Sequence, residues 1–297
     1  MKKYLRFANL LTLVAGAAGM LLMAWLYGSG TDQRGLYQAN HPAWILLGIL
    51  TVAVVMGAWL LARQAGTSRN YRQNFPPSIL SAIGCVVAAI GLAYGSLQAL
   101  EEKSVLSMLT GLFGILGGAG LLWGAACRFR GQRSKFPIHT LPCFFFALQL
   151  FLLGQEFGSE PEMYRYLYRF WALLTMVPAC YWLWSFDVNL GKRTTCLFWC
   201  LVAAYCNLVA VIGMGVGLLH GCTALWMLTN LPRLRYLPKQ SRPAPEPAPV
   251  APAEEIISTE ETAEAELPVA EGLTVELPDP DVILEELLRD FSTQENP

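Results

Sequence analysis

Four residues of this chain have the types and spacing of a site for a soft metal ion. His139 and Cys143 are four residues apart, and so are Cys196 and Cys200. In a helix this spacing places both members of a pair on one face, and imidazole and thiolate ligands suit zinc or copper. No zinc-finger loop spacing accompanies the two pairs. We therefore favour ordinary packing of these cysteines in apolar segments and expect neither a bound metal nor a cofactor.

Three polar side chains interrupt long apolar stretches of the sequence. They are Gln149, Thr175 and Asn207, and each falls near the middle of its stretch. In a membrane, such side chains hydrogen-bond between helices, and in carriers they line solute sites near the midplane. We favour the packing role and keep a site for a small, uncharged solute as the alternative.

Groups that could catalyse a reaction are scarce. The sequence contains no phosphate-binding glycine loop, no His-Glu-x-x-His motif, no Gly-x-Ser-x-Gly motif and no pair of carboxylates on one helix face. The ionisable residues nearest to apolar interiors, Glu156 and Asp187, lie at the ends of their stretches, and His41 and His220 are expected on the outer side of a membrane. We expect a protein that is not an enzyme, and we expect no nucleic-acid partner.

The elements that position these residues are eight long apolar stretches. Of the 297 residues, 54% are hydrophobic and 14% are charged, far fewer charges than the roughly 25% of a soluble domain. In a bilayer each backbone polar group must be satisfied within its own segment, so apolar runs of about 20 residues form spanning helices. The sequence predicts an all-α, polytopic bundle of about eight spans, starting near Leu5, Pro42, Pro77, Val105, Ile138, Tyr166, Thr195 and Gly217.

Lysine and arginine are concentrated in alternate loops between these stretches. Because cytosolic loops carry an excess of Lys and Arg, this bias predicts that both termini are cytosolic. The first stretch, Phe7–Tyr27, is longer than the apolar core of a secretory signal and is expected to remain as a span. We expect the cytoplasmic membrane as the location. The predicted cytosolic segments are residues 1–6, 63–74, 128–135, 189–193 and all after 232.

Two cations contradict the loop bias at the outer start of the sixth stretch. Arg165 and Arg169 lie there, close in sequence to Glu156, Glu160 and Glu162. We favour an ion cluster at the membrane interface over an external anion site.

Two parts of the bundle raise questions of packing. Residues 194–231 must supply two crossings and a turn within about 38 residues, so one tilted helix with a re-entrant segment is the alternative. Glycines recur at four-residue intervals, a spacing that lets helices approach closely. Because the fourth stretch is especially rich in glycine over Gly111–Gly124, we expect it in the interior of the bundle.

The chain divides into three regions by composition. The predicted bundle covers residues 1–237, a linker rich in Pro, Ala and Glu covers 238–278, and a short acidic helix covers 279–297. Up to Arg242 there are 20 Lys and Arg against 7 Asp and Glu, whereas the remainder has 1 against 15. The linker has too few apolar residues to fold by itself, so we expect it to be disordered.

The last region has the pattern of an amphipathic helix. Its start, Asp279-Pro280, resembles an N-cap followed by proline at the first helical position. A helix of this length gains order by placing its apolar face in a groove of a partner. We expect an anchor in the lipid bilayer that recruits a cytosolic protein, with a carrier or channel subunit as the alternative. The apolar stripe consists of Ile283, Leu284, Leu287, Leu288 and Phe291.

Overall fold

The structure, a computed structural model, describes residues 7–30, 41–66, 71–102, 104–134, 140–157, 166–212 and 216–234. All of them belong to the compact unit Met1–Pro243, which is separate from Ala244–Pro297. The predicted stripe at 283–291 therefore lies outside the described residues. Within the described ranges all regular elements are helices, which confirms the predicted all-α class. They are α2 (Ala8–Ser29), α3 (Pro42–Arg63), α4 (Tyr71–Asn74), α5 (Ile79–Glu101), α6 (Val105–Arg130), α7 (Thr140–Phe157), α8 (Leu167–Ser185), α9 (Arg193–Ala210) and α10 (Gly217–Leu234).

Local capping residues define several of the helix ends. His41 precedes Pro42 at the first turn of α3, and its Nδ1 accepts a hydrogen bond from the backbone of Ala43. Ser104 forms a reciprocal capping box with Ser107 at the start of α6. Such side chains satisfy backbone donors that have no partner inside the helix. These signals explain why the observed starts of α3 and α6 coincide with the predicted ones.

Several helices have the dimensions of membrane spans. Five of them, α2, α3, α5, α6 and α9, are long and apolar enough to cross a bilayer, and Thr140–Glu156 within α7 is a shorter apolar helix. The segment 194–231 forms two helices of 18 residues, α9 and α10, which pack against each other. Each is about 27 Å long, close to the thickness of the hydrocarbon core. These helices fit a membrane protein.

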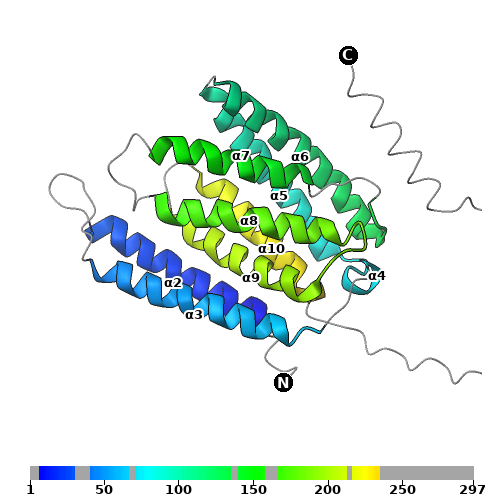
Figure 1. Cartoon of the computed structure of the whole chain (residues 1–297), viewed down its shortest axis with the longest axis horizontal. Coiled ribbons are helices and arrows are strands. Elements are labelled where there is room, and N and C mark those ends of the chain that lie inside the picture. Colours follow the sequence, from blue (N-terminus) through cyan, green and yellow to red (C-terminus); the bar gives the residue numbers. More distant parts are fainter. Residues whose placement is uncertain are drawn as a thin grey trace, which may run out of the picture. The chain divides into compact units, whose positions relative to one another are not determined.

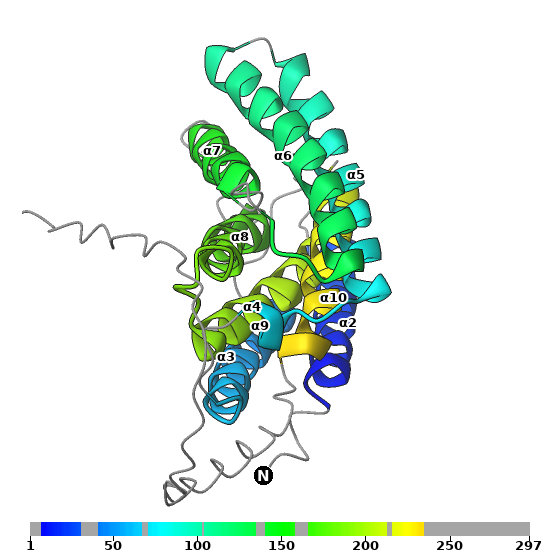
Figure 2. The ribbon, with the colours of Figure 1, turned by 90° about the vertical axis from the view of Figure 1, so that its right-hand side faces the viewer.

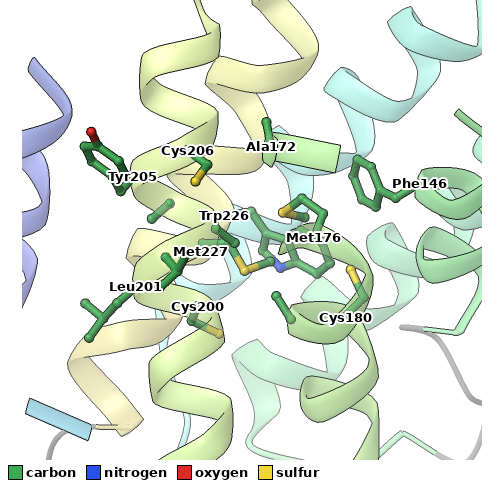
Figure 3. Packing of buried hydrophobic residues seen from close by; sticks show 14 of the residues in the cluster. Phe146, Ala172, Met176, Cys180, Cys200, Leu201, Tyr205, Cys206, Trp226 and Met227 are labelled. Atoms are coloured by element: carbon green, nitrogen blue, oxygen red, sulfur yellow. The ribbon is translucent and has the colours of Figure 1, made fainter. Parts of the chain in front are cut away.

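Six of the helices form a closed ring of neighbours. Each of α5, α6, α7, α8, α9 and α10 packs against the next, and α10 packs back against α5, while α2 and α3 cover another side of α9 (Figures 1 and 2). Large side chains occupy the inside of the ring, where Trp226 of α10 lies near Met176 and Cys180 of α8 and Phe146 of α7 (Figure 3). Trp226, Met176 and Phe146 are fully buried.

The most buried of the candidate spans is α9, rather than the glycine-rich α6. In the most apolar 18-residue stretch of each helix, about 72% of α9 is buried, against 39% of α6. The expectation that Gly111–Gly124 lies inside the bundle was therefore wrong. Four-residue spacing puts most of these glycines on one face, where Gly114 and Gly118 lie against α5, and the other faces carry large apolar residues. The exposed ones are Leu112, Ile115, Leu116, Leu122 and Trp123.

Candidate functional site

Asn207 of α9 is the centre of a polar network inside the bundle. Its side chain is fully buried. Its Nδ2 donates to the carbonyls of Ala203 at 2.8 Å and Ala172 at 3.4 Å. Its Oδ1 lies 2.9 Å from both the Thr223 hydroxyl and Nδ1 of His220, which donates in this contact when it carries the proton. The network joins α9 to α8 and to α10.

All hydrogen-bonding positions of the Asn207 amide face a partner. An asparagine side chain offers two donors and two acceptor positions, and the four contacts above place a partner within hydrogen-bonding distance of each of them. A buried polar group without partners is costly, whereas a satisfied one costs little and fixes the arrangement of its neighbours. The arrangement therefore suits a fixed connection between helices better than a site that exchanges solutes.

The other two residues of the predicted polar layer are placed differently. The hydroxyl of Thr175 donates within its own helix, to the carbonyls of Trp171 and Ala172. The Ala172 carbonyl also accepts from Asn207, so the structure brings Thr175 and Asn207 together. Gln149 of α7 is buried, but in the described part of the chain no hydrogen bond links it to either residue.

His220 and Thr223 belong to this network, and the sequence analysis did not assign them to it. His220 is 1% exposed and Thr223 is fully buried. His220 was expected on the outer side because it lies in the region of the predicted turn between the last two stretches. The two residues are three positions apart, on one face of a helix. That spacing was the available signal, because the same face of α10 meets α9.

A second polar cluster, also missed, attaches α3 to the ring. The Thr51 hydroxyl of α3 lies 2.7 Å from the hydroxyl of Tyr168 on α8 and 3.0 Å from that of Tyr205 on α9. It also donates to the Leu47 carbonyl of its own helix. Most of α3 is otherwise apolar and exposed, as in a helix that faces lipid. These hydroxyl contacts give α3 a specific position on α8 and α9.

The predicted interfacial ion cluster is described only in part. Arg169 donates to Glu156 Oε2 at 3.2 Å, and the pair joins the end of α7 to the start of α8. Arg165, Glu160 and Glu162 lie outside the described residues. Both members of the pair are partly exposed, and pairs of this kind stabilise a protein by at most about 1 kcal/mol.

The cysteines of the predicted metal pattern make packing contacts. Cys143 Sγ donates to the Val177 carbonyl of α8 at 3.4 Å, and the sulfur atoms of Cys196 and Cys200 are 3.9 Å apart. His139 lies outside the described residues. Within the described ranges, no three His, Cys, Asp or Glu side chains are grouped closely enough to hold a metal ion.

Comparison with known proteins gives no functional assignment. No family model, no curated protein and no solved structure matches this chain. Among the described residues, the Asn207 network joins three helices through buried polar contacts.

Replacing Asn207 by leucine tests the role of the network. Asn207→Leu keeps the approximate volume but removes every contact of the amide, and it leaves Nδ1 of His220 without its partner. We expect the free energy of unfolding in mixed micelles to fall by about 1 kcal/mol, with insertion and cellular role retained. Thr175→Val is the matched control, because the Thr175 hydroxyl donates within its own helix, and it should cost less than about 0.5 kcal/mol. A stable, correctly inserted Asn207→Leu protein that has lost its cellular role would contradict the packing role.

Proposed function

We propose that this chain is a non-enzymatic membrane anchor that recruits a cytosolic protein. In this proposal its eight long helices cross the cytoplasmic membrane, both termini are cytosolic, and Ile283–Phe291 provides the contact for the partner. The bundle holds the recruiting segment at the membrane surface and transports nothing.

The observation that carries the proposal is that each hydrogen-bonding position of the Asn207 amide has a protein partner within hydrogen-bonding distance. A solute site needs polar groups that are free to bind the solute in at least one state. The Asn207 side chain has its donors on two carbonyls and its acceptor next to Thr223 and His220. Inside the ring of helices, Trp226 packs among other buried apolar side chains (Figure 3). Both features favour a fixed scaffold.

The placement of the cationic loops supports the proposed topology. The backbone of Ser78 donates to the Arg128 carbonyl at 3.1 Å, and the Tyr71 hydroxyl donates to the Gln132 carbonyl at 3.2 Å. The rings of Phe75 and Phe186 meet edge to face at 5.3 Å. The segments between α3 and α5, after α6 and after α8 therefore meet at one end of the bundle. All of them belong to or adjoin segments that the charge bias predicts to be cytosolic.

Reporter fusions test the number of spans and their orientation. Fusions after Gln73, Gln132, Lys192 and Lys239 should report a cytosolic position, and fusions after Gln33, Glu102 and Ser159 an external one. The reason is the excess of cations on one side of the proposed membrane. A paired phosphatase and fluorescent-protein reporter at each site provides the measurement. A cytosolic result at Gln33 would contradict the eight-span topology.

The acidic character of the last region favours a protein partner over a lipid surface. Residues from Pro243 onward have 15 Asp and Glu against a single Arg, and anionic lipid repels such a segment. An apolar stripe flanked by acids suits a groove with a basic rim. The preceding linker, with its many prolines, would let the stripe search a wide volume around the anchor.

Two acidic substitutions in the stripe test the recruiting role. Leu287→Asp with Leu288→Asp should abolish capture of the partner by the full-length protein in mild detergent, because the charges cannot enter an apolar groove. Capture is measured by quantitative mass spectrometry, together with membrane insertion. Ser292→Asp with Thr293→Asp is the matched control, which adds the same charge beyond the stripe and should retain capture. If the two double variants captured the same amount of the partner, the stripe would be excluded as the contact.

A carrier or channel subunit for a small uncharged solute is the second candidate. The observation that favours it is His220, an ionisable side chain inside the bundle, where such groups often mark pathways. The two candidates differ in their sensitive residues. A carrier should lose its function in a stable Asn207→Leu protein and tolerate changes in the stripe, whereas an anchor should show the reverse.

A further inference from the structure

Two arginines at one end of the bundle are almost completely buried. Arg128, near the end of α6, is 3% exposed, and Arg193, at the start of α9, is 1% exposed. A buried guanidinium group without hydrogen-bonding partners is strongly destabilising, because it has lost its hydration.

Arg193 is held by one of its three nitrogens. Its Nη1 donates to Oδ1 of Asn74 at 3.3 Å. Within the described residues, its Nε and Nη2 have no hydrogen-bond acceptor, although both are buried. These two nitrogens form the lateral edge of the guanidinium, whose parallel N–H groups match two oxygens of one oxyanion.

In Arg128 the two terminal nitrogens of the guanidinium, rather than the lateral pair, are available to a ligand. Its guanidinium carbon lies 3.6 Å from the centre of the Phe75 ring, in a cation–π contact. Its Nη1 and Nη2 are both buried and, in the described part of the chain, lack an acceptor. The two terminal nitrogens form an end-on fork, which also binds oxyanions through two bonds.

The two forks belong to one local cluster. Arg193 contacts Asn74, and Arg128 contacts the next residue, Phe75, so a single dipeptide at the end of α4 connects them. The arginines come from α6 and α9, so three separate segments of the chain converge here.

Among the residues that the structure describes, the acids at this end of the bundle do not balance the two positive charges. Asp187 is buried at this end and makes an interaction of its own, so it can neutralise at most one guanidinium. Tyr71 is not a counter-ion, because burial raises the pKa of its phenol, an effect that Asp187 reinforces and Arg128 opposes. Among these groups one positive charge remains without a counter-ion.

We propose that Arg128 and Arg193 bind an oxyanion of the phosphate class at this end of the bundle. A tetrahedral phosphate offers enough oxygens to accept from both forks and supplies the missing negative charge. The oxyanion is either free phosphate or the headgroup of an acidic phospholipid. Because both guanidinium groups are covered by protein, the bound oxyanion should exchange slowly. This site is independent of the proposed recruiting role.

Thermal unfolding of the purified full-length protein in neutral detergent tests the proposal. One arm adds potassium phosphate, with chloride adjusted to keep ionic strength constant. A second, phosphate-free arm adds phosphatidylglycerol, with phosphatidylcholine as its reference. A ligand at ten times its Kd should raise Tm by about 3 °C or more. A rise with phosphate identifies the free anion, and a rise with phosphatidylglycerol alone identifies the lipid. Phosphorus analysis of the protein before any addition detects an oxyanion that was retained during purification.

Lysine substitutions show whether the forks are the site. Arg128→Lys and Arg193→Lys keep the charge but remove the paired donors, and each should weaken apparent affinity by about tenfold or abolish retention of phosphorus. Arg130→Lys is the matched control, because Arg130 is exposed two residues further along α6, and it should behave as the unmodified protein. No rise in Tm together with no retained phosphorus would overturn the proposal. An equal loss in Arg130→Lys would overturn it too, because it would indicate a general effect of surface charge.

Discussion

The bundle depends on the requirement that a polar side chain buried among apolar helices must find all its partners within the protein. Asn207 meets this requirement through carbonyls of α8 and α9 and through His220 and Thr223 of α10. Each partner lies at a fixed distance and direction, so satisfying one amide sets the position of three helices. Unlike apolar packing, which tolerates small shifts, this arrangement allows few alternatives. The hydroxyl cluster of Thr51, Tyr168 and Tyr205 extends the same principle to α3.

Between these polar connections, small residues allow close packing. Among helices surrounded by lipid, association depends on van der Waals contact and hydrogen bonds, so backbones that approach closely gain most. A Cβ on Gly91 of α5 would lie 2.6 Å from the Cβ of Cys222 on α10, and one on Gly118 of α6 would lie 3.3 Å from the Ala89 carbonyl of α5. By contrast, Gly48 and Gly57 of α3 have open space around them. Glycine thus has a packing role where α5 meets α6 and α10, and no such role on the outer face of α3.

Much of the fold could be predicted because its physical causes are local. Apolar runs are visible in the sequence, and the observed helices begin within a few residues of the predicted starts. The inference about α6 failed because glycine content indicates close packing but not which helix is central. Asn207 could be singled out as a polar residue in an apolar stretch. Its partner His220 could not, because its position near a predicted turn placed it at the outer side of the membrane rather than beside Asn207. The sequence placed Arg128 and Arg193 in cytosolic segments between the spans, and their contacts with Asn74 and Phe75 join residues that are far apart in the sequence.

The central proposal is that the interior around α9 is closed to water. This is expected of a membrane anchor, whereas a carrier has an interior that water can reach. Cys206 tests it directly, because it precedes Asn207 and is 2% exposed. The measurement is site-resolved labelling of the native protein in membrane vesicles with a small, water-soluble methanethiosulfonate reagent, quantified by mass spectrometry against denatured protein. A buried structural thiol is inert to such reagents. We expect Cys206 to remain unlabelled until the protein is denatured. Rapid labelling of Cys206 in the folded protein would show that water reaches the middle of the bundle and would contradict the account.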